Sequence, residues 1–227
     1  MIAQARHLQR CCTRAAARFL REHASDVPLI FEALLAAEDH RGLKHQGIDW
    51  FSIGRAIYRV PEMKGFKGIS TIEQQLVRTI FPRRGVPRWR RKGRECALAV
   101  HVAKTLPKTT IWAAYLHCAY YGRDYPTYAH IRRKFIQREA SIDVVAAARI
   151  VSCLKYPSPH RDDHAWLFVH ARRTKYVLRR LTTICQRGDI AALAAHELDV
   201  PATDPCLSIS SEHGEDQGVA LTNSRGR

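Results

Sequence analysis

The sequence predicts a mainly α-helical protein. Apolar residues recur at three- and four-residue steps through most of the chain, which is the spacing of one helix face. No stretch alternates between apolar and polar residues for long enough to indicate a sheet. A length of 227 residues with 46% hydrophobic content is enough for a substantial core in one or at most two domains.

The first helix is expected at residues 3–21, and its pattern is amphipathic. One side carries the basic residues Arg6, Arg10, Arg14 and Arg18. Another side carries the apolar residues Leu8, Cys12, Ala15, Ala16 and Phe19. Two interpretations follow: the helix packs against the body and leaves a solvated basic face, or it lies on a membrane with its apolar face among anionic lipids.

A second helix is expected to open at Ser25 or Asp26, with Pro28 in its first turn, and to end near Gly42. Its apolar stripe consists of Val27, Ile30, Phe31, Leu34 and Leu35, and the next position on the stripe is Glu38. A carboxylate in a core-facing place must be paired with a cation, protonated, or held at the floor of a cleft. From the pattern alone, a structural ion pair and a catalytic group both remain open.

The third helix is expected to begin at Ser70, because Ser70 and Glu73 have the spacing of a capping box. Hydrogen-bonding groups share one face of this helix: Thr71, Gln74, Gln75 and Arg78. Polar groups that end in a cation near a helix N-terminus favour an anionic, hydroxyl-rich ligand.

A formal net charge of +16 points to an anionic partner. The strongest basic run consists of Arg83, Arg84, Arg88, Arg90, Arg91, Lys92 and Arg94. Pro87 can start a fourth helix within this run. A solvated helix, a phosphate site and a nucleic-acid contact are all consistent with the run, although Trp89 is its only aromatic residue.

Further helices are expected at residues 108–119, 128–138, 143–154 and 164–187. The chain is therefore divided into a basic N-terminal helix (1–24), a main domain (25–187) and a C-terminal extension (188–227), which is expected to be largely disordered after Pro201. Seven cysteines without a CxxC pair suggest neither a disulfide framework nor a zinc site. No apolar run is long enough for a transmembrane helix, and the N-terminus does not look like a secretory signal.

Three ordered motifs resemble a known enzyme family. The sequence contains EDHRGLKHQGID at 38–49, GISTIEQQL at 68–76 and RKGRE at 91–95. Together they resemble the family 51 glycosyltransferases, the peptidoglycan glycosyltransferase domains of penicillin-binding proteins and monofunctional transglycosylases. A fourth stretch, KTTIWAAYLHCAYYG at 108–122, is similar to a family helix that ends in a YLN-type sequence. The similarity extends over about residues 28–181.

The resemblance implies a lysozyme-like helical domain with a substrate cleft. It implies a reaction in which lipid II-type disaccharides are joined into glycan strands and polyprenyl pyrophosphate is released with inversion. Glu38 would be the base at the acceptor hydroxyl, a role that burial would favour. Glu95 would match the family's second glutamate. The expected substrate-binding residues are Asp39, His45, Ser70, Thr71, Gln74, Gln75, Arg78, Arg91 and Lys92.

The resemblance also implies partners and a location. The expected partners are a lipid-linked disaccharide, an anionic membrane surface and other cell-wall synthesis proteins, and nucleic acid is not expected under this interpretation. No cofactor is required and no metal ligand is assigned, although a divalent cation, Mg²⁺ or Mn²⁺, could assist at the pyrophosphate. The expected location is the outer, periplasmic face of the cytoplasmic membrane.

Several positions depart from the family pattern. Glu73 stands where the motif usually has threonine, and Gly42 stands where it has an aromatic residue. His117 replaces the asparagine of the YLN-type sequence. A second hypothesis is therefore a catalytically weakened relative that binds glycan or lipid pyrophosphate. A glycan-cleaving enzyme with two carboxylates is a further alternative on a lysozyme-like fold.

Overall fold

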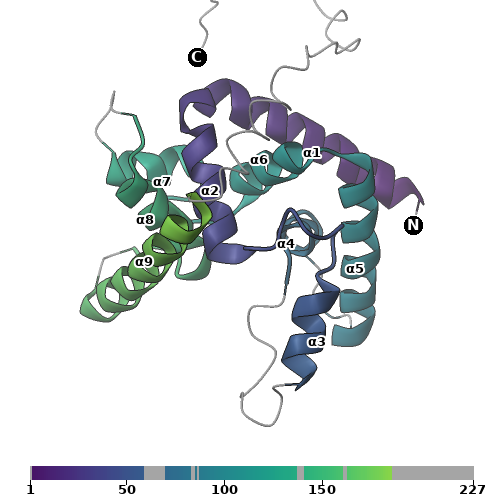
Figure 1. Cartoon of the computed structure of the whole chain (residues 1–227). Helices are drawn as coiled ribbons and strands as arrows, with labels where there is room; N and C mark the ends of the chain where they lie inside the picture. Colours follow the sequence, from purple (N-terminus) through teal and green to yellow (C-terminus); the bar gives the residue numbers. More distant parts are fainter. Residues whose placement is uncertain are drawn as a thin grey trace, which may run out of the picture.

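The computed structural model describes residues 2–58, 70–82, 85, 87–136, 141–160 and 163–185. The helices in these ranges are α1 (Ile2–His23), the 3₁₀ turn η1 (Ala24–Asp26), α2 (Val27–Glu38), α3 (Trp50–Tyr58), α4 (Ile72–Ile80), α5 (Arg88–Thr105), α6 (Lys108–Cys118), α7 (Tyr128–Phe135), α8 (Val144–Lys155) and α9 (His164–Cys185) (Figure 1). Within the described ranges, β-pairing is limited to one isolated bridge between Gly122 and Ser158. The mainly helical prediction is confirmed. Arg83, Arg84 and the C-terminal extension lie outside the described residues.

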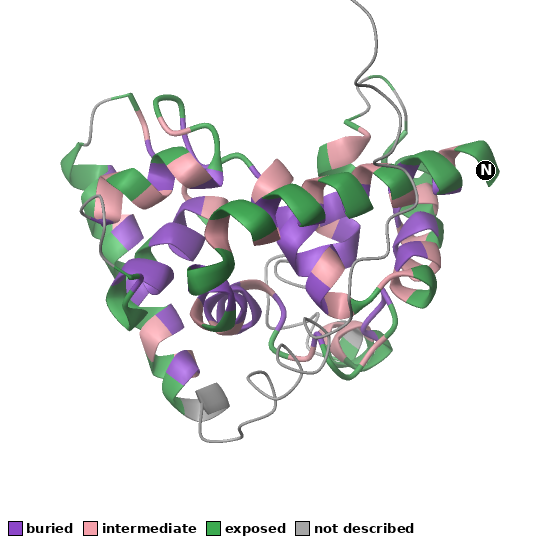
Figure 2. Cartoon of the chain, turned by 90° about the horizontal axis from the view of Figure 1, so that it is seen from above, coloured by how far each residue is buried: buried purple, intermediate pink, exposed green. Residues whose placement is uncertain are grey.

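α1 packs along α6, and its apolar face is part of the core (Figure 1). Leu8, Cys12 and Phe19 are fully buried, whereas the arginines of the other face are exposed. Figure 2 shows the same division along the chain, with buried positions on the inner faces of the helices and exposed positions outside. The packed interpretation of this helix is confirmed, and the interpretation with its apolar face in a membrane is wrong. Across the described ranges, none of the helices is both long and apolar enough to span a bilayer.

α2 begins as expected, with Asp26 at the N-cap and a proline in the first turn. It ends at Glu38 instead of near Gly42, because Asp39 leaves the helical conformation with φ −154° and ψ 70°. The carboxylate of Glu38 therefore projects from the last residue of a buried helix into the space beyond it. The sequence patterns did not predict α3, whose nine residues are too few for a clear periodicity.

The capping-box prediction for α4 is wrong in register. The N-cap is Thr71, whose side chain accepts a hydrogen bond from the backbone N–H of Gln74. Glu73 is one residue too early to reach back to this cap and instead forms a buried ion pair with Lys108. The Thr71 hydroxyl also donates to the carbonyl of Gly47 at 2.8 Å, which attaches the loop after α2 to the start of α4.

Gly47 is required at this attachment for two reasons. Its φ of +86° lies in the left-handed region, and a Cβ there would lie 2.5 Å from the carbonyl oxygen of Ala99. We expect Gly47→Ala to lower the free energy of unfolding by about 1–3 kcal/mol, because backbone strain of this kind has that cost. Denaturant unfolding measures the change. Gly54→Ala is the matched control, since a Cβ at Gly54 would meet no atom within 4 Å.

Candidate active site

A cleft of about 860 Å³ opens between the end of α2, the α4 helix, the end of α8 and one face of α9. Its polar and charged lining consists of Glu38, Asp39, His40, Arg55, Ser70, Gln75, Arg78, Lys155, Tyr156, Arg172, Arg173, Tyr176 and Arg180. Basic groups outnumber the two carboxylates in this lining. The cleft is therefore suited to a ligand with several negative charges.

Glu38 lies in this cleft with both carboxylate oxygens hydrogen-bonded. Oε1 accepts from Nη2 of Arg173 at 3.0 Å, and Oε2 accepts from Nε2 of Gln75 at 3.1 Å. Arg173 also donates to the carbonyl of Ala37, so it is held against the end of α2. The exposed fraction of the Glu38 side chain is 14%. Glu38 is therefore ion-paired and also lines a cleft, and its catalytic role stays a prediction.

Tyr115 fixes the amide that faces Glu38. Its hydroxyl donates to Oε1 of Gln75 at 2.8 Å, which directs the Nε2 donor of Gln75 toward the carboxylate. Burial, with the Glu38 charge added to it, raises the pKa of Tyr115 well above its usual range. The hydroxyl therefore keeps its proton and remains a donor at neutral pH.

The helix α9 supplies three of the six Lys and Arg side chains that line the cleft. Val169, Arg172, Arg173, Tyr176 and Arg180 all line the cleft and recur at the steps of one helix face. Burial and the Arg180 charge lower the pKa of His40, so this imidazole is neutral at pH 7. Arg173, Arg180 and Tyr115 were not among the expected site residues, although Tyr115 is the tyrosine of the YLN-like stretch at 108–122 and the basic face of α9 was a signal in the sequence.

Five expected site residues line the cleft: Glu38, Asp39, Ser70, Gln75 and Arg78. Three others lie under it. His45 is bonded to Asp39, Thr71 to the loop at Gly47, and Gln74 to Lys92 and Cys96 on α5. The expectation that Thr71, Gln74, Gln75 and Arg78 face one ligand is wrong, because adjacent Gln74 and Gln75 point to different neighbours.

The remaining expected residues lie on α5. Nζ of Lys92 donates to Oε1 of Glu95 at 2.7 Å, to Gln74 at 2.9 Å and to Ser70 at 3.3 Å. Glu95 is buried, and Arg91 is exposed. None of Arg91, Lys92 and Glu95 lines the cleft around Glu38. Ser70 lines the cleft and accepts a hydrogen bond from Lys92, so it connects the cleft with these residues of α5. The catalytic role of Glu95 stays a prediction.

The start of α4 offers fewer free donors than expected. The backbone N–H of Ile72 donates to Oδ2 of Asp39 at 3.3 Å, and that of Gln74 donates to the Thr71 hydroxyl. Two of the first-turn donors therefore already have partners within the protein. Charge stabilisation in the cleft must come chiefly from side-chain cations.

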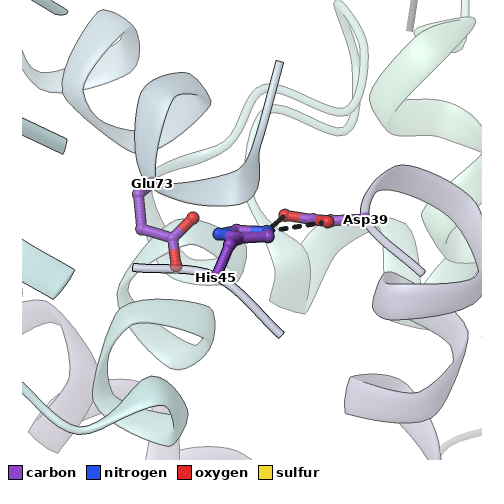
Figure 3. Close-up of side chains that lie close together, drawn as sticks. All are labelled: Asp39, His45 and Glu73. Atoms are coloured by element: carbon purple, nitrogen blue, oxygen red, sulfur yellow. Dashed lines mark hydrogen bonds and ion pairs between the residues drawn. The ribbon is translucent and has the colours of Figure 1, made fainter. Parts of the chain in front are cut away.

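Beneath the cleft, His45 lies between the carboxylates of Asp39 and Glu73 (Figure 3). Nε2 of His45 is 2.9 Å from Oδ2 of Asp39. The Glu73 carboxylate bonds Nζ of Lys108, which also donates to the carbonyl of His45. This group joins the loop after α2 to α4 and α6.

A family model described as transglycosylase matches residues 9–182. The chain belongs to the transglycosylase family. It is 30% identical over 169 residues to a biosynthetic peptidoglycan transglycosylase of Bdellovibrio bacteriovorus, an alignment that covers 73% of this chain and 66% of that protein. A protein of the same name from Rhodospirillum centenum is 32% identical, with 76% and 72% covered.

Penicillin-binding protein 1A of Rickettsia bellii is 29% identical over 76% of this chain, but only 22% of that longer protein is covered. The chain spans just under two thirds of the Bdellovibrio relative, at 66% of its length. The family resemblance drawn from the motifs at 38–49, 68–76 and 91–95 is thereby confirmed. All of the cleft-lining residues from Ala36 to Arg180 fall inside the matched range.

Proposed function

We propose that this chain is a peptidoglycan glycosyltransferase that polymerises lipid II-type disaccharides and releases polyprenyl pyrophosphate. The observation that carries the proposal is the position of Glu38, a carboxylate held by Arg173 and Gln75 in a strongly basic cleft. Membership of the transglycosylase family supports this choice over other uses of a basic cleft.

In the proposed reaction, the acceptor sugar's 4-hydroxyl oxygen attacks the anomeric carbon of the donor. The bond between that carbon and the pyrophosphate oxygen breaks with inversion, and the pyrophosphate leaves with the bonding electrons. Glu38 takes the hydroxyl proton as a general base. Arg173 and Gln75 hold the carboxylate in one orientation, so that little reorganisation is needed when the proton arrives.

Negative charge develops on the leaving pyrophosphate, and cations must meet it. Arg78, Arg55 and Arg172 line the same cleft as Glu38 and are suited to this task. Arginine matches phosphate oxygens with two parallel donors, which gives orientation as well as charge. The proposal requires no cofactor, and a role for Mg²⁺ or Mn²⁺ beside Glu95 remains a prediction.

The test is turnover of labelled lipid II by the full chain in bilayers, with polyprenyl pyrophosphate measured by mass spectrometry. The proposal predicts that one molecule of polyprenyl pyrophosphate is released for each glycosidic bond formed. Cleavage of preformed glycan without use of lipid II would indicate a hydrolase instead. Tight binding of lipid II without any product would indicate the binding-protein alternative.

We further propose that the exposed face of α1 contacts anionic lipids. The supporting observation is the row of exposed arginines Arg6, Arg10 and Arg14, whose helix is anchored to the protein by its apolar face. This geometry would place a cationic surface on the membrane without inserting the helix. A lipid-linked substrate requires such proximity, and the outer face of the cytoplasmic membrane is the proposed location.

Replacing Arg6, Arg10 and Arg14 together with glutamine is expected to weaken binding to vesicles that contain anionic lipid. Each basic residue near such a surface contributes about 1 kcal/mol, so the partition constant should fall by about 100-fold. Co-sedimentation with anionic and neutral vesicles measures the change. Equal binding of the wild type and the triple variant would contradict this part of the proposal, and Gln4→Ala on the same helix is the control.

A further inference from the structure

Asp39, His45 and Glu73 form a buried group beneath the cleft (Figure 3). Their side chains are almost closed to solvent, with exposed fractions of 6% for Asp39, 4% for His45 and 1% for Glu73. The group comes from three places in the chain: the residue after α2, the following loop and the first turn of α4. One potential ligand atom from each side chain lies within 4.8 Å of the other two.

Two atoms of this group have no hydrogen-bond partner. Both Nδ1 of His45 and Oε2 of Glu73 are buried and unsatisfied. The other nitrogen of His45 is bonded to Asp39, and the other oxygen of Glu73 is bonded to Lys108. A buried polar atom without a partner carries a large desolvation cost, so a pair of such atoms in one group requires an explanation.

The chemistry of the two atoms indicates a bound cation. An ionised Asp39 only accepts hydrogen bonds, so Nε2 of His45 must carry the hydrogen that it donates. Nδ1 of a neutral imidazole then presents a lone pair, and Oε2 of Glu73 presents another. With Asp39 and Glu73 ionised and Lys108 charged, the group has an excess of one negative charge.

We propose that this group binds a divalent transition-metal ion such as Zn²⁺, with Nδ1 of His45 and Oε2 of Glu73 as ligands. Asp39 holds the imidazole through Nε2, which is the carboxylate–histidine–metal arrangement of protein metal sites. A mixed imidazole and carboxylate donor set selects zinc-like ions over Mg²⁺, which prefers oxygen ligands alone. Asp39 also lines the cleft, so the proposed site adjoins it.

The site is a feature of this chain and does not depend on the proposed reaction. Glu73 stands where the motif of the family usually has threonine, which cannot supply a charged ligand. The metal would connect the loop next to Glu38 with the helix that carries Gln75, and so stiffen the floor of the cleft.

The experiment uses the full chain, treated with a chelator and then titrated with Zn²⁺, Mn²⁺ or Mg²⁺. Bound metal is measured by elemental analysis, and stability is measured as Tm. At about 100 times Kd, Zn²⁺ should raise the Tm of the wild type by about 5 °C or more, with one ion bound per chain. Mg²⁺ should give no comparable shift.

Three variants separate the site from other effects. Glu73→Gln should weaken Zn²⁺ binding by at least about 10- to 100-fold, the loss caused even by removal of an outer partner. Lys108→Gln breaks the ion pair of Glu73 without removing a ligand, so it should retain the ion. Asp124→Asn disrupts an exposed carboxylate–histidine pair with His160 and should change nothing.

The absorption spectrum of the Co²⁺ form of the wild type tests the ligands even if Glu73→Gln fails to fold. The proposal predicts d–d bands without thiolate charge transfer, whereas a site on cysteines would show that transfer and overturn it. Equal Zn²⁺ binding by the wild type and Glu73→Gln would also overturn it. The absence of a Tm shift in the wild type would overturn it as well.

Discussion

Replacing Glu38 with glutamine is expected to lower kcat for glycan polymerisation by about 10²- to 10⁴-fold, the contribution of a positioned general base. Glutamine keeps the size of the side chain and an oxygen that can accept from Arg173, but its amide nitrogen then faces the Nε2 donor of Gln75, so that hydrogen bond is lost. Glutamine cannot take a proton from the acceptor hydroxyl. Affinity for lipid II should therefore change much less than turnover.

The measurement for this first prediction is a steady-state rate with labelled lipid II, together with a binding isotherm for the same substrate. Glu22→Gln is the matched control, because Glu22 is an exposed carboxylate on α1 that pairs with Arg18. The control should retain full activity. A Glu38→Gln enzyme with wild-type kcat would show that the proton leaves by another route.

Replacing Asp26 with alanine is expected to cost about 3–5 kcal/mol in the free energy of unfolding, as when one partner of a buried ion pair is removed. Asp26 is fully buried and accepts from Nε of Arg132 at 2.7 Å and from the Tyr128 hydroxyl at 2.9 Å. These bonds connect the start of α2 to α7, about a hundred residues later in the chain. Their loss removes this carboxylate from Arg132, whose side chain is only 18% exposed.

Denaturant unfolding of the Asp26→Ala variant measures this second prediction. The hydrogen bond to Asp26 raises the pKa of Arg132, and the variant loses this contribution. The guanidinium still stays charged in the variant, because an arginine side chain does not lose its proton near neutral pH. The double variant Asp26→Leu with Arg132→Met should recover part of the loss, since apolar groups can replace a buried pair. The free energy of unfolding of Asp26→Ala could instead lie within about 1 kcal/mol of the wild-type value, roughly the contribution of an exposed ion pair. That result would contradict a stabilising role for the buried bonds of Asp26.

Periodicity predicted most helices because their faces pack against one core. Leu8 and Phe19 on α1 are buried as their spacing indicated, and Glu38 was found because it interrupts an apolar stripe. The short helix α3 contains too few turns for this signal. Sequence spacing also could not decide whether Ser70 or Thr71 caps α4, because both residues can accept the bond and only the loop geometry selects one.

The partners of Glu38 illustrate the remaining limit. Arg173 is 135 residues from Glu38 in the chain. Gln75, the other partner of Glu38, is oriented by a tyrosine on another helix. No local pattern relates such residues, because their contact depends on how α2, α4, α6 and α9 pack. Glu73 is a second example. Its spacing from Ser70 predicted a capping box, whereas its actual partner is Lys108, which no local pattern relates to it.

The most direct test of the central claim is a gel of glycan strands made from labelled lipid II in bilayers, with wild type and Glu38→Gln at equal concentration. The account predicts a ladder of strands from the wild type and none, or traces, from the variant. Equal ladders would contradict Glu38 as the base. No ladder from a folded wild-type protein that binds lipid II would contradict the proposed activity itself.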